Sequence, residues 1–164
     1  MSKIKLSILL LISTIVFQSC STTIESRYKF SIDYITGGVD GLNLKNNLLL
    51  NLTGLDLYDQ NSELLIKGNI NHSQSLYITN VDNTSDRERI SSDLQINIYN
   101  QNINCNVYQF NENLEQYYVI TSAQNFTSNN KAVEQIKLRN TEIMVQSFIL
   151  ELISQYNFEC LNEK

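Results

Sequence analysis

Few side chains in this 164-residue sequence could carry out covalent or proton-transfer chemistry. There are three cysteines and one histidine, His72, which has no acid or thiol at a fixed spacing and is therefore expected on the surface. The sequence contains no Gly-x-Ser-x-Gly, His-Glu-x-x-His or Cys-x-x-Cys motif and no glycine-rich phosphate loop. A metal site would need Cys105, Cys160 and His72 to converge in space. We therefore predict a protein that is not an enzyme and has no metal or cofactor.

Two arginines are the best candidates for binding. Arg87 and Arg89 are two residues apart in a predicted strand, so their side chains should point to the same face. A guanidinium group can make bidentate contacts with phosphate, and the pair is a candidate contact for an anionic lipid headgroup. The alternative is ordinary solvated charge, because Asp86 and Glu88 flank the two arginines.

The first 19 residues have the layout of an export signal. A short basic stretch, Met1 to Lys5, precedes an uncharged, mostly apolar run of 12 residues from Leu6 to Phe17. That run is well short of the ~20 residues that a membrane-spanning helix needs. A basic start followed by a short apolar core is typical of a secretory signal peptide.

The residues that end this apolar run indicate the type of signal. Phe17-Gln18-Ser19-Cys20 resembles the lipobox of bacterial lipoproteins, with an apolar residue three positions before the cysteine and a small residue directly before it. The resemblance implies cleavage of residues 1–19 and covalent lipid, including palmitate, on Cys20. Residues 20–26 then form a short lipidated tether, and residues 27–164 form a single domain.

Composition limits the classes of partner. Without residues 1–19 the chain keeps 10 basic and 17 acidic residues, a net charge of −7. Nucleic acid is an improbable partner for a chain this acidic. Outside the cytoplasm Cys105 and Cys160 are free to form a disulfide, but two free thiols are an equally good interpretation.

The first half of the domain alternates strand and helix patterns. Apolar residues at every second position predict strands at residues 28–34, 64–70 (continuing to Ile78 after a polar break at 72–74) and 90–98. Between the first two strands we expect a helix with Asp40 as its N-cap and Gly54 as its C-cap. Its apolar stripe is Leu44, Leu48 and Leu52. Residues 80–86 should form a loop.

In the second half of the domain the strand boundaries are less distinct in the sequence. The apolar positions change parity at Ile103, Cys105 and Val107, which indicates either a bulge near Asn100 or a separate short strand. A polar turn is expected at residues 111–113 and a last strand at residues 117–126.

The chain should end in a helix of roughly seven turns from Asn129 to near Tyr156. The second half of that helix is apolar nearly all round, and we favour burial against the sheet over contact with another protein. Leu48 and Ile136 are predicted core residues joining the helices to the sheet. The expected fold is α+β, in the order β-α-β-β-β-α, with about four strands and both helices on one face.

With this order and the lipobox established, the chain resembles the LptE family of lipopolysaccharide-assembly lipoproteins. Three segments carry the resemblance: the leucine-rich helix closed by glycine at 42–54, the strand beginning with the arginine pair at 87–98, and the segment at 122–132 that leads into the last helix. The resemblance implies an outer-membrane lipoprotein on the periplasmic side. Its partner would be an LptD-type β-barrel, and it would assist delivery of lipopolysaccharide to the cell surface.

A second function class also fits the sequence. A free-standing periplasmic or surface lipoprotein that binds a soluble target, such as an inhibitor or an antigen, would have the same signal and the same lack of catalytic motifs. Such a protein would not depend on a barrel partner for its abundance, and a small all-β inhibitor would lack the long last helix.

Overall fold

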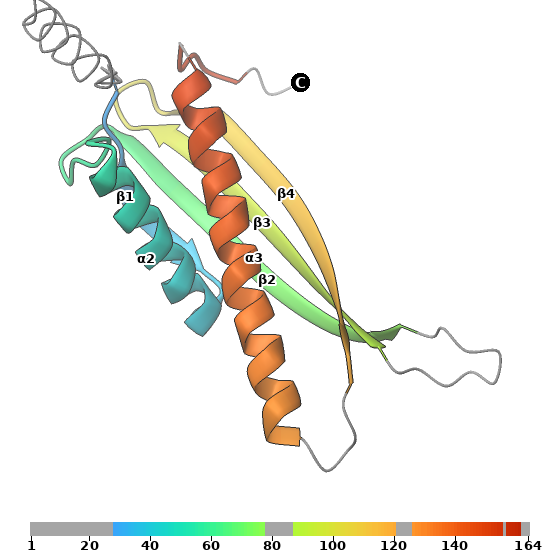
Figure 1. Cartoon of the computed structure of the whole chain (residues 1–164). Helices are drawn as coiled ribbons and strands as arrows, with labels where there is room; N and C mark the ends of the chain where they lie inside the picture. Colours follow the sequence, from blue (N-terminus) through green and yellow to red (C-terminus); the bar gives the residue numbers. More distant parts are fainter. Residues whose placement is uncertain (1–27, 78–86, 121–125, 156, 162–164) are drawn as a thin grey trace, which may run out of the picture.

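The computed structural model describes residues 28–77, 87–120, 126–155 and 157–161 (Figure 1). The predicted signal peptide, the lipidation site Cys20, the tether up to residue 26 and the predicted loop at 80–86 lie outside the described residues. The side chains of residues 126–128 are not described either.

The described residues form one mixed sheet of four strands in the order β1-β2-β3-β4. The strands are β1 (Ser31–Thr36), β2 (Leu64–Tyr77), β3 (Arg87–Asn100) and β4 (Cys105–Val119). Strands β1 and β2 are parallel, and α2 (Gly38–Gly54) connects them. The pairs β2–β3 and β3–β4 are antiparallel. The chain continues into α3 (Phe126–Ser154). This confirms the α+β fold and the predicted order of elements.

Both helices pack on the same face of the sheet, α2 over β1 and β2, and α3 over β3 and β4 (Figure 1). We call this the covered face and the opposite one the open face. Strand residues alternate between the two, and those on the covered face form the core, for example Ile66 and Ile70 on β2 and Leu94, Ile96 and Ile98 on β3. The period-two patterns therefore predicted the buried sides of β2 and β3 correctly. In β1 the predicted buried face is wrong at Tyr34, which is 66% exposed, because the register with β2 shifts between Ile32 and Ile35.

Helix α2 begins three residues earlier than its sequence suggests. Its N-cap is Gly37, with φ +118°, followed by Gly38 with φ +62°, and Asp40 lies in the first turn, so the predicted Asp40 cap is wrong. Glycine is required at position 37 because a Cβ there would lie 2.6 Å from the carbonyl oxygen of Ile70. At the other end Gly54 is the last helical residue and Leu55 is the C-cap, so the predicted Gly54 cap is wrong by one residue.

The predicted core stripe of α2 is confirmed, since Leu44, Leu48 and Leu52 are completely buried. Ile136, by contrast, is only half-buried, so its prediction as a core residue is wrong. The physical reason is its position on α3, where it lines an open groove together with Asn47 of α2.

The apolar second half of α3 is buried in the molecule, as favoured from the sequence. Phe148 packs against Tyr108 and Phe110 of β4, and its neighbours on the same side of α3 are also buried: Met144, Val145, Ile149 and Leu152. Leu150 is the exception and is largely exposed.

Strand β4 is longer than predicted. Residues 101–104 form a turn with Ile103 exposed, and the parity change reflects both a register shift after Ile98 and a new strand that starts at Cys105. The turn expected at 111–113 is wrong, because Asn111 and Asn113 lie within β4, opposite Gln95 and Asp93. The last strand expected at 117–126 is also wrong, since β4 ends at Val119 and Phe126 begins α3.

Candidate functional site

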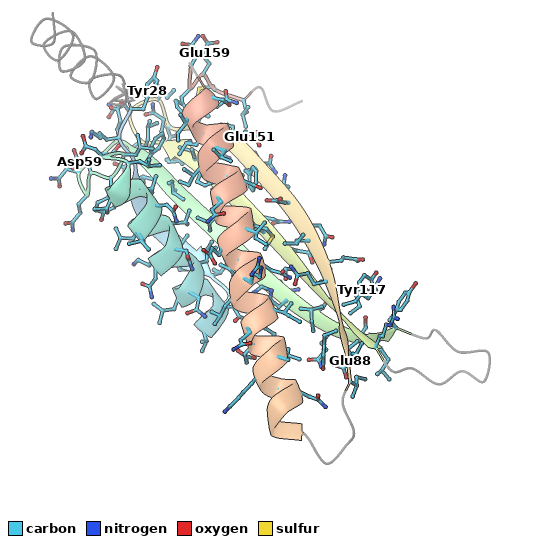
Figure 2. All side chains as sticks on the ribbon, in the orientation of Figure 1. Tyr28, Asp59, Glu88, Tyr117, Glu151 and Glu159 are labelled. Carbon is cyan, nitrogen blue, oxygen red and sulfur yellow. A yellow bond between two sulfur atoms is a disulfide. The ribbon has the colours of Figure 1, made fainter. Side chains whose placement is uncertain are left out.

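The candidate binding residues lie at one end of the sheet, which we call the distal end. It consists of residues 72–77 of β2, 87–92 of β3 and 114–119 of β4, held in register by antiparallel pairing. Figure 1 shows this end extending past α2, and Figure 2 shows Tyr117 and Glu88 there. The distal end therefore presents side chains on both faces of the sheet.

The arginine pair lies on the open face of the distal end, with both residues on one face, as strand geometry requires. Arg89 makes an ion pair with Glu115, with 3.5 Å between Nη1 and Oε1, and its Nε lies 3.4 Å from the Ser75 hydroxyl oxygen. Both charged partners remain partly exposed. Glu115 thus partly neutralises Arg89, a contact that the sequence spacing did not reveal.

Aromatic side chains surround the two arginines. Tyr77 on β2 is the register partner of Arg87, and Tyr117 on β4 is the register partner of Arg89. The two tyrosine rings meet across β3 in an edge-to-face contact, with 4.9 Å between centroids, although both residues stay well exposed. Val119, beside Arg87, is exposed as well. Guanidinium groups beside exposed apolar and phenolic surface suit an amphiphile with an anionic headgroup.

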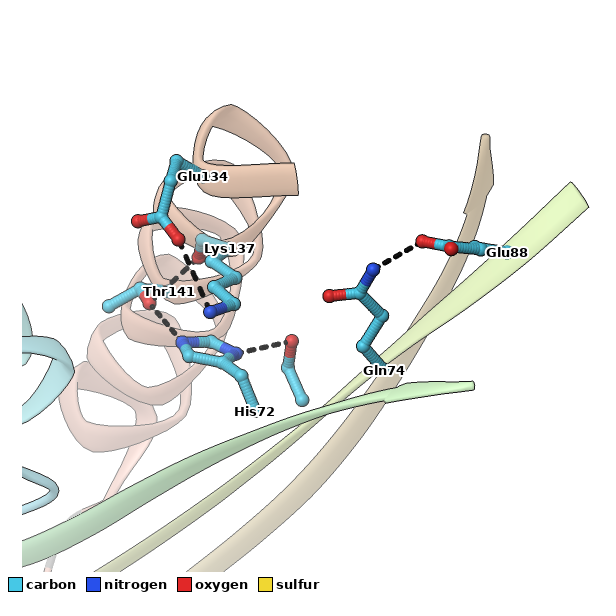
Figure 3. A network of polar contacts seen from close by, with 7 residues as sticks. His72, Gln74, Glu88, Glu134, Lys137 and Thr141 are labelled. Atoms are coloured by element: carbon cyan, nitrogen blue, oxygen red, sulfur yellow. Dashed lines mark hydrogen bonds and ion pairs between the residues drawn. The ribbon is translucent and has the colours of Figure 1, made fainter. Parts of the chain in front are cut away.

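On the covered face the distal end carries a group of hydrogen-bonded polar side chains. Gln74 and the Tyr118 hydroxyl both donate hydrogen bonds to the Glu88 carboxylate (Figure 3 shows the contact between Gln74 and Glu88). Burial raises the pKa of Tyr118 to about 12, helped by its hydrogen bond to Glu88 and by the charge of that carboxylate. Tyr118 therefore remains a neutral donor at physiological pH.

His72 lies between the sheet and α3, so the prediction of a surface histidine is wrong. Its Nδ1 is 2.7 Å from the Ser92 hydroxyl, and its Nε2 is 3.4 Å from the hydroxyl of Thr141 on α3 (Figure 3). The amide nitrogen of Asn140 donates to Ser92 across 2.8 Å. Ser92, Asn140 and Thr141 are all buried. His72 has the same parity as Ile66 and Ile70, a sequence signal that indicates its orientation.

Burial lowers the pKa of His72 below its usual 6.5. Lys137 acts in the same direction, whereas Asp40, Glu134 and Asp93 oppose the shift. The polar cluster of His72, Ser92, Asn140 and Thr141 thus ties α3 to the sheet with neutral groups. Its members are hydrogen-bonded to one another, so its arrangement suits packing more than proton transfer.

The opposite end of the molecule is closed by a disulfide between Cys105 and Cys160, whose Cα atoms are 5.7 Å apart. The segment after α3 places Phe158 against the rings of Tyr28, Phe30 and Tyr108. Of the two alternatives left open by the sequence, the structure has the disulfide. Cys105 and Cys160 lie far from the arginine pair and do not form one site with it.

Two features are absent from the part of the chain that the structure describes. No group of three or more histidine, cysteine or acidic side chains there is arranged to hold a metal ion. No helix among these residues is long and apolar enough to cross a membrane.

No protein-family model matches the sequence, and comparison with curated proteins gives no match. Solved structures do match. The minor lipoprotein from Acinetobacter baumannii superposes with a TM-score of 0.58 at 12% identity, over 79% of this chain and 92% of that one. Lipoprotein B from Nitrosomonas europaea has a TM-score of 0.55 at 12% identity, covering 77% and 83%.

A third solved structure, rare lipoprotein B from Shewanella oneidensis, has a TM-score of 0.54 at 8% identity and covers 76% of this chain and 96% of its own. The chain has the fold of these bacterial lipoproteins. At such low identities the similarity shows the shared fold alone.

Proposed function

We propose that this protein is an outer-membrane lipoprotein, lipidated on Cys20, that partners an LptD-type β-barrel in the assembly and delivery of lipopolysaccharide. The observation that carries the proposal is a fold shared with bacterial lipoproteins in a chain whose residues 17–20 resemble a lipobox. The segments at 42–54 and 87–98 that resemble the LptE family are α2 and β3 of this fold. The role is binding and assembly, not catalysis.

The open face of the sheet suits the lumen of a barrel. The lumen of an outer-membrane barrel is polar, and the open face is built from polar side chains that bond to each other across strands. Asn113 of β4, for example, donates to the Asp93 carboxylate at 2.6 Å and to the Ser91 hydroxyl at 3.1 Å on β3. Further polar residues on this face are Lys67, Asn69, Asn71, Ser73, Gln95 and Asn97.

The distal end would meet lipopolysaccharide. Its two arginines would contact phosphate groups, and the exposed rings of Tyr77 and Tyr117 would lie along the sugar and acyl portions of the molecule. Glu115 must then release or share Arg89 when a phosphate arrives, because the ion pair occupies part of that guanidinium.

Co-purification tests the partnership. When the tagged, full-length protein is extracted from membranes in mild detergent, a large β-barrel should be recovered with it, and an unrelated tagged lipoprotein should not recover that barrel. Depletion of the protein should lower both the correctly assembled barrel and surface lipopolysaccharide. If both are unchanged in depleted cells, the partnership is refuted and the free-standing lipoprotein that binds a soluble target takes its place.

Mass spectrometry tests the anchor. The N-terminal peptide of the membrane-purified protein should begin at Cys20 and carry lipid, and Cys20→Ala should leave the chain unlipidated and its signal uncleaved at this site. An unmodified N-terminus at another position would contradict the assignment.

A further inference from the structure

Helix α2 carries a second row of apolar side chains on the side away from its core stripe. Val39 is 77% exposed, Leu42 57%, Leu49 37% and Leu50 72%. With 3.6 residues per turn these four side chains fall within an arc of about 100°. We call them the outer row. A helix that is apolar on two sides needs cover on both, but the rest of the described chain covers only the side of Leu44, Leu48 and Leu52 (Figure 1).

The charge around the outer row differs from that of the rest of the chain. In a sequence with 17 acidic residues, α2 contains one acidic residue, Asp40, and one basic residue, Lys45. Asp40 lies outside the arc of the outer row and acts on His72, and Asp56, just after the helix, is paired with Lys29. Asn46 and Thr53, on the same side of the helix, are neutral. A surface without carboxylates can approach anionic phospholipid headgroups, whereas most of this acidic protein would be repelled by them.

The chain between the predicted anchor and the domain is long enough for the outer row to reach the membrane that holds the anchor. The backbone nitrogen of Phe30 donates to the carbonyl of Leu57 at 2.8 Å, and the nitrogen of Asp59 donates to the carbonyl of Phe30 at 2.9 Å. The chain thus enters the domain beside the segment that directly follows α2. Ten residues separate Cys20 from Phe30 and span at most about 35 Å when fully extended. The 17-residue α2 is itself about 25 Å long.

We propose that the outer row of α2 rests on the surface of the phospholipid leaflet that holds the lipid on Cys20. This inference depends on the lipidation in the proposed function. An amphipathic helix lies in the plane of a membrane with its apolar side at the boundary between headgroups and acyl chains. The tether makes this contact intramolecular, so a small apolar surface is enough to maintain it. A polar barrel lumen would offer no comparable apolar partner.

The orientation assigns different surroundings to the two sides of the molecule. The outer row meets lipid, while the open face, on the other side of the sheet from the helices, stays in water or against a polar partner. Ser73, exposed on the open face of β2, is therefore a matched control position for Leu50.

The test uses the lipidated full-length chain in vesicles of phosphatidylethanolamine and phosphatidylglycerol. An environment-sensitive fluorophore is attached to Leu50→Cys or Ser73→Cys, and nitroxide-labelled phospholipid is added as a quencher. We expect blue-shifted emission and loss of fluorescence at position 50, with neither change at position 73. Equal quenching at the two positions would overturn the proposal, as would shielding of position 50 only when the barrel is included.

A second variant separates docking from folding. Leu42→Glu places a carboxylate in the outer row at an exposed position, so the thermal midpoint should stay unchanged while quenching at position 50 is lost. Retained quenching in Leu42→Glu would contradict the proposal. The mass of the N-terminal peptide from the same sample reports lipidation. An unlipidated Cys20 refutes both proposals, whereas a lipidated chain with equal quenching refutes this one and leaves barrel co-purification unaffected.

Discussion

His72 contributes to stability through its neutral form. Its ring is held between Ser92 and Thr141, and burial lowers its pKa below the unfolded value of 6.5. The folded state therefore binds fewer protons than the unfolded state between the two pKa values. The stabilisation is fully present above pH 6.5 and is lost as the pH falls from there toward the lowered pKa of the folded state.

Replacing His72 should remove this pH dependence. In His72→Gln the amide can still bond Ser92, but it does not titrate, so the thermal midpoint should change less between pH 7.5 and pH 5 than in the natural protein. Thermal unfolding followed by circular dichroism at a series of pH values measures this. The charges that face His72, Asp40 on α2, Asp93 on β3 and Glu134 and Lys137 on α3, are retained in both proteins. Parallel pH profiles would show that His72 is not the titrating group.

The arginine pair gives a prediction on binding. If Arg87 and Arg89 contact phosphates, the double variant Arg87→Ala and Arg89→Ala should weaken binding of purified protein to lipopolysaccharide about tenfold or more, because charge-assisted hydrogen bonds contribute about 1.5–3 kcal/mol. Arg139→Ala removes a positive charge from α3, which packs on the covered face and not on the open face that carries the arginine pair, and serves as the control. A double variant that binds as tightly as the control would remove the arginines from the site.

At the scale of the element, α2 offers a comparison between two leucines on one helix. Leu48 is completely buried and Leu50 is 72% exposed. Leu48→Ala should lower the free energy of unfolding by about 2–5 kcal/mol, because it leaves a cavity in the core, whereas Leu50→Ala should change it by about 0.5 kcal/mol or less. Denaturant unfolding of the purified domain measures both. Similar losses would show that α2 is not packed through Leu48.

Elements were predictable from sequence where one face of a strand or helix is apolar. The stripe of α2 and the alternation in the first half of β2 fixed both elements and their buried sides. At residues 72–74 the strand was predicted to continue past a polar break, and β2 does run through them. Prediction failed at residues 111–113, where both faces of the strand are polar and the period-two pattern disappears. Asn111 and Asn113 lie on the open face there, so a continuous strand looked like a turn.

The site was predictable in part for the same reason. Strand alternation placed Arg87 and Arg89 on one face, but the ion pair with Glu115 and the contact between Tyr77 and Tyr117 depend on the register between β2, β3 and β4. Register between distant segments is set by packing in the folded state, which no single stretch of sequence contains. The pairing of Cys105 with Cys160 depends on tertiary structure in the same way.

For the whole molecule, the disulfide fixes the end opposite the distal end. It links residues 55 apart in sequence, and the chain-entropy model predicts a stabilisation of about 4 kcal/mol for a loop of that length. The double variant Cys105→Ser and Cys160→Ser should lower the free energy of unfolding by about this amount. Denaturant unfolding without reductant measures the change. Equal stability of the natural protein with and without reductant would contradict a stabilising bond.

Strand β4 also has a consequence for aggregation. It is an edge strand in the sheet order, paired with β3. Among the described residues, the backbone nitrogen of Leu161 adds a hydrogen bond to the carbonyl of Asn106 near the start of β4, at 2.8 Å. An unpaired strand edge is a template for pairing with another chain. The disulfide holds Leu161 in place through its neighbour Cys160. Reduction of the disulfide therefore leaves more of the β4 edge unpaired. Protein expressed in a reducing compartment should self-associate more readily than the oxidised form.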